Sequence, residues 1–158
     1  MADWIEEGHP APDFALTADD GSTVRLNELR GSPVVLYFYP RDNTPGCTKE
    51  ACAFRDRKSE IDAQGAVLLG VSPDTAESHV KFKSKFDLNF RLLADPDHQV
   101  AEQYGAWREK NMYGKKSFGI QRSTYLLDAE GRVAKVWRQV KVEGHDDQVL
   151  EALQSLPD

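Results

Sequence analysis

Apolar residues along this chain gather in short runs that alternate with longer, mostly polar segments. The runs at residues 34–39 and 66–71 are continuous, largely β-branched or aromatic, and typical of strands buried on both faces. Shorter runs predict further strands at residues 13–16, 23–26, 90–93, 124–127 and 133–137. Turn residues at 20–21 and 128–131 lie between two pairs of these runs and predict a hairpin at each place.

The segments between the strands are suited to helices. Helices are expected from residue 44 or 45 to 63, and over residues 74–86, 97–104 and 145–156. Val80, Phe82 and Phe86 are among the apolar positions of the helix at 74–86. Residues 106–118 are polar and basic and are expected to form a loop.

The predicted order is strand–helix–strand–helix, followed by a hairpin and a last helix. This order implies right-handed crossovers between parallel strands and an antiparallel edge. It indicates an α/β protein with a thioredoxin-like fold, an N-terminal hairpin extension and an insertion before the C-terminal hairpin. No repeat, low-complexity tract or linker interrupts the sequence, so residues 1–158 are expected to form one domain.

Composition and charge narrow the classes of partner. Of the 158 residues 40% are hydrophobic, and the formal net charge is −6 at pH 7. This acidity argues against nucleic acid or an anionic membrane as the main partner, and no apolar run approaches the ~20 residues of a membrane span. The first residues lack the apolar core of a signal peptide, so a cytoplasmic location is expected. The histidines at positions 9, 79, 98 and 145 lack ligand spacing and are expected at the surface, with no metal site.

Cys47 and Cys52, the only two cysteines, carry the strongest chemical signal. In a reducing compartment two cysteines are poor candidates for a structural disulfide, which favours redox or metal chemistry. Thr44 and Pro45 have the residue types of a helix N-cap and first helical position, so Cys47 falls in the first turn. Unpaired amides and the positive end of the helix dipole favour a thiolate there.

A thiolate at Cys47 also calls for a cation. An ordinary thiol is about 3% ionised at pH 7, and making it mostly ionised takes about 3.4 kcal/mol, whereas a helix terminus supplies about 1 kcal/mol. Arg41, Lys49 and Arg55 are near in sequence, but Arg122 is the better candidate. It precedes the strand at 124–127, which would carry it to the Cys47 loop if this strand neighbours the one at 34–39.

The spacing of the two cysteines has a mechanical consequence. In an intact helix, Cα atoms five residues apart are separated by about 8.6 Å, beyond the roughly 7 Å that a disulfide spans. A bridge between Cys47 and Cys52 would therefore require the first turns of the helix to unwind.

The segment at residues 38–52, FYPRDNTPGCTKEAC, resembles the active-site signature of the peroxiredoxins. More narrowly, it is similar to the bacterioferritin comigratory protein (Bcp), or PrxQ, subfamily. The P-x-x-x-T-x-x-C pattern is specific for the family, and the second cysteine five residues later for the subfamily. The resemblance covers nearly the whole chain and includes APDF at 11–14, GVS at 70–72, YGAW at 104–107 and RST at 122–124.

The resemblance implies a thiol-dependent peroxidase. Cys47 would be the peroxidatic cysteine, which becomes a sulfenic acid, and Cys52 the resolving cysteine, which condenses with it to an intrachain disulfide. The Thr44 hydroxyl would hydrogen-bond the thiolate and the peroxide. Arg122 would stabilise the thiolate and the charge that moves onto the leaving oxygen.

Two further residues and the partners also follow from the resemblance. Pro40 would shield the sulfur from water, and Glu50 would orient Arg122. Hydrogen peroxide and organic hydroperoxides would be the substrates, and thioredoxin or a similar dithiol the reductant. No metal or prosthetic group is implied, and an intrachain disulfide removes the need for a dimer, so a monomer is expected.

Other interpretations of the same residues stay open. A general thiol–disulfide oxidoreductase would share the fold, although it would use a C-x-x-C pair rather than this C-x-x-x-x-C. A redox-gated holdase would expose apolar surface when the helix unwinds. Cys52 could be a core residue, and Trp107 either loop packing or a lid near the site. The lysines at 110, 115 and 116 could be a solvated loop or a contact for the reductant.

Overall fold

The computed structural model describes residues 3–156. Its strands are β1 (Ala15–Ala18), β2 (Thr23–Arg25), β3 (Val34–Phe38), β4 (Val67–Ser72), β5 (Arg91–Ala94), β6 (Trp107–Met112), β7 (Lys115–Ile120), β8 (Ser123–Leu127) and β9 (Val133–Trp137). Its helices are the 3₁₀ helix η1 (Leu26–Leu29), α1 (Pro45–Asp56), α2 (Lys58–Ala63), α3 (Ala76–Phe86), α4 (Gln99–Gln103) and α5 (His145–Gln154).

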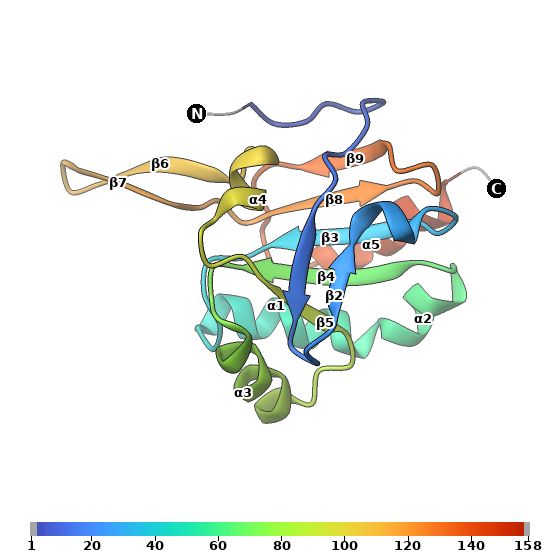
Figure 1. Cartoon of the computed structure of the whole chain (residues 1–158), viewed down its shortest axis with the longest axis horizontal. Helices are drawn as coiled ribbons and strands as arrows, with labels where there is room; N and C mark the ends of the chain where they lie inside the picture. The colour runs from blue at the N-terminus through green and yellow to red at the C-terminus, as the bar shows by residue number, and fades with distance from the viewer. Residues whose placement is uncertain (1–2, 157–158) are drawn as a thin grey trace.

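Seven of the strands form one mixed sheet in the order β2-β1-β5-β4-β3-β8-β9 (Figure 1). The central strands β3, β4 and β5 run parallel. Strands β8 and β9 add an antiparallel edge on one side, and the β1–β2 hairpin adds another beside β5. The predicted parallel crossovers, antiparallel edge and N-terminal hairpin are confirmed.

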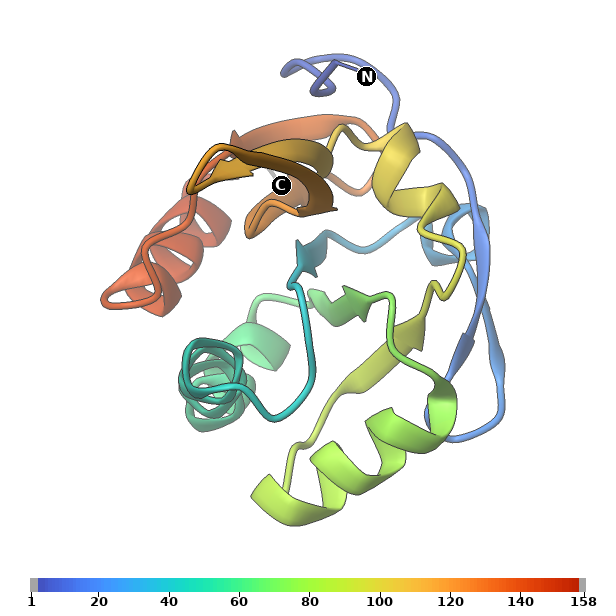
Figure 2. The ribbon, with the colours of Figure 1, turned by 90° about the vertical axis from the view of Figure 1, so that its left-hand side faces the viewer.

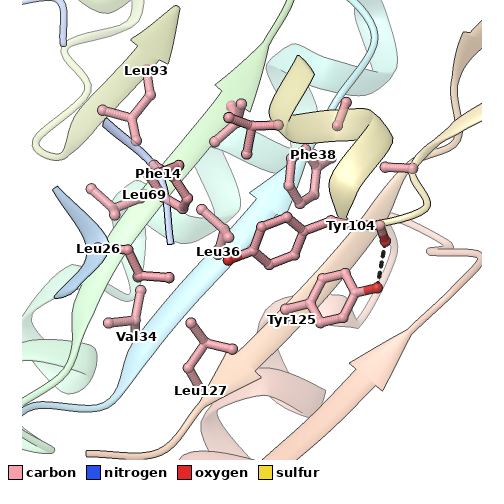
Figure 3. Close-up of a cluster of buried hydrophobic side chains, with 14 of the residues drawn as sticks. Phe14, Leu26, Val34, Leu36, Phe38, Leu69, Leu93, Tyr104, Tyr125 and Leu127 are labelled. Carbon is pink, nitrogen blue, oxygen red and sulfur yellow. Dashed lines mark hydrogen bonds between the residues drawn. The ribbon is translucent and has the colours of Figure 1, made fainter. Parts of the chain in front are cut away.

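The two faces of the sheet bury separate clusters of side chains. Val35 and Tyr37 of β3 point to the face covered by α1, α3 and α5, which Figure 2 shows together on one side of the curved sheet. Leu36 and Phe38 point to the opposite face, where they lie in the cluster with Tyr104 and Tyr125 (Figure 3). Because β3 is buried from end to end, the loop that leaves it toward α1 starts from a rigid point.

The predicted loop at 106–118 is instead a β-hairpin, and that expectation was wrong. Strands β6 and β7 pair in antiparallel register around Tyr113 and Gly114, which both have positive φ, as a two-residue hairpin turn requires. The ribbon projects from the body of the molecule (Figure 1), so most of its side chains are polar or exposed. Without a buried face, its strands lack the apolar alternation by which a strand is recognised in sequence.

The predicted helix from 44 or 45 to 63 is two helices, α1 and α2. The chain turns at Arg57, where the backbone amide of Arg57 donates to the carbonyl of Phe54, three residues earlier. This is the hydrogen bond of a 3₁₀ turn, which is tighter than an α-helical turn. The Arg57 guanidinium bonds to Asp146 and Asp147 at the start of α5. The break therefore coincides with a tertiary contact.

Three side chains lie where the sequence did not place them. His79 and His145, expected at the surface, are almost fully buried, while Val80, expected on an apolar face, is 49% exposed. His145 lies between the hydroxyl of Thr124 and the amide oxygen of Gln148, and burial lowers the pKa of its imidazole. Polar partners inside the fold make these burials possible, and such partners are set by tertiary contacts. Within residues 3–156, no helix is both long and apolar enough to cross a membrane.

Candidate active site

Cys47 lies in the first turn of α1, as predicted. The chain leaves β3, passes through residues 39–44 and enters the helix at Pro45, so Cys47 is its third residue. The amide of Thr48 makes a 2.8 Å bond to the carbonyl of Thr44, so amides earlier in the turn have no acceptor within the helix. The side chain of Cys47 is only 1% exposed. Its sulfur is thus held in a polar niche at the positive end of the helix.

Arg122 reaches this sulfur from the neighbouring strand. β8 pairs with β3 so that Ser123 lies opposite Phe38, where β3 turns into the Cys47 loop. Arg122, one residue earlier, places its Nη2 at 3.2 Å from the Cys47 Sγ. The expected position of Arg122 beside the cysteine loop is confirmed, and it depends on the pairing of these two strands.

Glu50, one turn further along α1, holds the other side of the same guanidinium. Its Oε1 accepts a 2.7 Å bond from Nη1 of Arg122, so the guanidinium bridges the carboxyl group and the sulfur. A Cβ on Gly46 would lie 3.1 Å from Nη2, so the glycine leaves room for the guanidinium. Burial lowers the pKa of Arg122, but the charges of Glu50 and Cys47 raise it by more.

Burial raises the pKa of Glu50 to about 7, against the opposing pull of Arg122. The carboxyl group is 2% exposed, and its Oε2 has no hydrogen-bond partner among the described residues. In the unfolded chain it would titrate near 4.5. Between these values the folded state holds a proton that the unfolded state has released.

We therefore expect the free energy of unfolding of the reduced protein to fall as pH rises from about 4.5 through 7. The loss due to this one group is on the order of 3 kcal/mol. Glu50→Gln keeps an oxygen acceptor for Arg122 but cannot titrate, so its stability should lack this component. Urea unfolding at pH 5 and pH 8 measures the difference. Equal pH dependence in the variant and the wild type would contradict the assignment.

Thr44 and Pro40 lie on the loop before Cys47, but within residues 3–156 neither forms a hydrogen bond with its sulfur. Thr44 occupies the N-cap position, but its side chain makes no capping bond; its hydroxyl instead donates to the carbonyl of Arg41 at 3.0 Å. Pro40 is exposed, next to the buried Tyr39. Their predicted roles therefore stay predictions.

Cys52 is half-buried on the same helix, and both thiols are free. Helix α1 is continuous through both residues, so the separation expected for an intact helix applies. No disulfide can form between them in this conformation. The requirement for unwinding follows from the helix itself.

Sequence reasoning did not place Lys110, a second cation, near the site. The ammonium group of Lys110, on β6, lies across Gly119 and donates to the carbonyl of Ile120. Burial and the charge of Arg122 lower its pKa, and the charge of Cys47 raises it. The sequence suggested Lys110 only as a solvated-loop residue or a contact for the reductant, because its position near the sulfur depends on the hairpin that the sequence did not predict.

The remaining residues singled out on this ribbon pack away from the sulfur or face solvent. Trp107 stacks on His98 with ring centroids 3.7 Å apart and, more loosely, on Phe118. Lys115 is exposed, and Lys116 lies 3.7 Å from Glu109. Trp107 is thus packed against the start of α4.

A second polar cluster was also missed. Potential ligand atoms of Asp42, Asp74 and His79 lie within 4.8 Å of one another, a geometry that could hold a metal ion. These side chains already hydrogen-bond to each other or to neighbouring groups. Of the three, only Asp42 lies on the loop that leads into Cys47; Asp74 follows β4, and His79 is on α3.

A cysteine held against an arginine at a helix start, beside a central parallel strand, defines a thiol-based redox protein of thioredoxin-like fold. Comparison with known proteins then identifies the family. Residues 8–136 match the AhpC/TSA family, and the chain belongs to it.

The similarity to individual relatives covers nearly the full length. Peroxiredoxin Bcp of Bacillus subtilis is 52% identical over 154 residues, which are 98% of this chain and 96% of the relative. Peroxiredoxin Bcp of Escherichia coli is 44% identical over 149 residues, 94% of this chain and 96% of that protein. Among solved structures, Peroxiredoxin Q of Xanthomonas campestris has a TM-score of 0.90 at 42% identity, covering 94% and 97% of the two chains. A PrxQ mutant of Xylella fastidiosa has a TM-score of 0.92 at 33% identity, covering 98% of each.

These similarities place the chain in the Bcp/PrxQ subfamily of the peroxiredoxins. The protein is therefore an enzyme, a thiol-dependent peroxidase. The thioredoxin-like α/β fold and the family expected from the sequence are confirmed.

Proposed function

We propose that Cys47 is the nucleophile of this peroxidase and that Cys52 resolves the product. The main support for this role is the position of the Arg122 guanidinium, which lies 3.2 Å from the Cys47 sulfur and is held on its other side by Glu50. A fixed cation at this distance stabilises a thiolate, which is the reactive form of cysteine.

In the first step the Cys47 thiolate attacks one oxygen of the hydroperoxide. A sulfur–oxygen bond forms as the O–O bond breaks, and the leaving alkoxide or hydroxide takes up a proton. Negative charge moves from the sulfur to the leaving oxygen in the transition state. The guanidinium of Arg122 and the free amides at the start of α1 are positioned where that charge develops.

In the second step the Cys52 thiolate attacks the sulfenic sulfur of Cys47, a sulfur–sulfur bond forms as the sulfur–oxygen bond breaks, and the hydroxide that leaves takes up a proton from solvent to give water. This step needs the first turns of α1 to open, because the intact helix holds the two residues too far apart. A dithiol reductant, thioredoxin or a similar protein, then exchanges with the disulfide and restores both thiols.

Thr44 and Pro40 complete the proposed site. The hydroxyl of Thr44, which donates to Arg41 in the peroxide-free state, would turn toward the bound peroxide. Pro40 forms part of the exposed rim next to the buried Tyr39 and would limit access of water to the sulfur.

The substrates we propose are hydrogen peroxide and alkyl hydroperoxides. The bacterioferritin comigratory protein of Xanthomonas campestris, 42% identical to this chain, is described as having alkyl peroxide reduction activity. The two free thiols suit a reducing compartment such as the cytoplasm. An intrachain disulfide needs no second subunit, so we propose that the protein acts as a monomer.

The test is intact mass and free-thiol count a few seconds after one equivalent of hydrogen peroxide at neutral pH. The wild type should lose both thiols and about 2 Da, the mass change of an intrachain disulfide. Cys52→Ser should instead gain about 16 Da, as a sulfenic acid. If the wild type retained both thiols, the role of Cys47 would be refuted. If Cys52→Ser still lost about 2 Da, the role of Cys52 in forming the disulfide would be refuted.

A further inference from the structure

The loop that joins β3 to α1 is anchored by one buried acid, Asp42. Its side chain is 4% exposed, although the residues on either side of it are open to solvent. Oδ1 accepts a 2.6 Å bond from the Tyr39 hydroxyl, and Oδ2 accepts a 2.8 Å bond from the Ser78 hydroxyl. The backbone amide of Asp42 donates to Asp74 at 2.7 Å. The loop is thus tied at both the side chain and the backbone.

His79, from α3, completes the anchor. It is fully buried, with Nδ1 at 2.7 Å from Oδ2 of Asp42 and Nε2 at 3.0 Å from the carbonyl of Leu93. The Nδ1 contact is to the same carboxyl oxygen that accepts from Ser78, and the Nε2 contact is to Leu93 of β5. His79 thus links the loop before Cys47 to both α3 and the sheet.

Asp42 of this hydrogen-bonded pair is close in sequence to the reacting sulfur, because it lies on the loop that leads into Cys47. Asn43, the next residue, has φ of 60°, a left-handed conformation that asparagine adopts more readily than most residues. Its side chain also accepts a 3.3 Å bond from Lys85 of α3. The side chains of Asp42 and Asn43 therefore both connect the loop to α3, a helix that carries no cysteine.

We propose that the buried Asp42–His79 hydrogen bond is a latch that positions the loop before Cys47 and sets how often the first turn of α1 opens. The proposal rests on the proposed function in one respect: opening is what allows Cys52 to reach Cys47. A closed latch keeps the sulfur beside Arg122 for the attack on peroxide, and an open latch permits the second step. Asp42 and His79 are positioning residues, because neither touches the reacting atoms.

If the latch controls the opening of α1, loosening it should change the fraction of the Cys47 sulfenic acid that goes to each of two products. The sulfenic acid either condenses with Cys52 or takes one oxygen from a second hydrogen peroxide, which gives a sulfinic acid and water. A looser latch raises the open population and so speeds condensation. The peroxide concentration that converts half of the protein to the sulfinic acid should then rise.

Asp42→Asn is the informative variant. An asparagine has the same shape but one acceptor oxygen in place of two, so it cannot accept from Tyr39 and Ser78 on separate oxygens as Asp42 does. The anchor of the loop is therefore weakened without a change in side-chain volume. Lys83→Met is the matched control, because Lys83 also lies on α3 and its 2.9 Å salt bridge to Asp19 does not involve the loop. His79→Gln tests the other partner and should change both readouts in the same direction.

Two readouts decide the proposal. Amide hydrogen exchange of the reduced protein over residues 45–52 should be about tenfold faster in Asp42→Asn, and within about twofold of wild type in Lys83→Met. The peroxide concentration for half conversion to sulfinic acid, measured by intact mass, should rise about tenfold in Asp42→Asn and stay unchanged in Lys83→Met. Unchanged exchange in Asp42→Asn, or equal acceleration in Lys83→Met, would overturn the latch. If the wild type formed no disulfide, the proposed function would fail, and the exchange measurement would still test the latch.

Discussion

Replacing Cys47 by serine is expected to lower peroxide turnover by at least about 10³-fold. A serine hydroxyl is not ionised at neutral pH, and neither the helix terminus nor the Arg122 guanidinium at 3.2 Å can make it so. The reaction is measured as peroxide consumption by the pre-reduced protein in a single turnover, so that no external reductant is required.

Cys52→Ser is the matched control for this experiment, since it removes the other thiol on the same helix. Its first turnover should proceed at close to the wild-type rate, because the attack on peroxide precedes the need for Cys52. If the two serine variants lost the first turnover equally, the assignment of Cys47 as the attacking thiol would not stand.

Arg122→Met should slow the first turnover by about 10²- to 10³-fold, the usual effect of removing one fixed donor from a developing charge. The methionine has no charge for the sulfur and no donor for Glu50, whose carboxyl group would stay buried without a partner. Arg122→Lys should recover only part of the rate, because one ammonium cannot replace the planar fork that bonds both groups.

Two measurements separate catalysis from folding in these variants. The pH dependence of Cys47 alkylation by iodoacetamide should move to higher pH in Arg122→Met, since the thiolate has lost its cation. Arg41→Met removes an exposed arginine from the loop before Cys47 and should leave both rate and profile unchanged. If Cys47 of Arg122→Met were alkylated with the same pH dependence as in the wild type, the contact between Arg122 and the sulfur would not be what activates the thiol.

Local sequence patterns were sufficient for the framework of the fold. The continuous apolar runs at 34–39 and 66–71 are the parallel strands β3 and β4, because only strands covered on both faces carry such runs. Thr44 and Pro45 marked the start of α1 and so placed Cys47 in its first turn. The distance between Cys47 and Cys52 followed from helix geometry alone.

Polar contacts between distant segments were not predictable in the same way. His79 pairs with Asp42 across 37 positions of sequence, and nothing local distinguishes it from a surface histidine. The β6–β7 hairpin escaped notice because its strands have no buried face and hence no apolar alternation. The position of Lys110 depended on that hairpin and was missed with it.

Arg122 lies between these two cases. Its proximity to Cys47 could be inferred only by assuming that β8 neighbours β3, a pairing that the fold makes between residues such as Phe38 and Ser123, which are far apart in sequence. The sequence by itself thus determined the thiol, its helix terminus and the need for that helix to open, because each depends on residues within one or two turns. Tertiary structure decided which cation meets the sulfur, how Glu50 titrates and what holds the loop, because burial and charge are properties of segments brought together by folding.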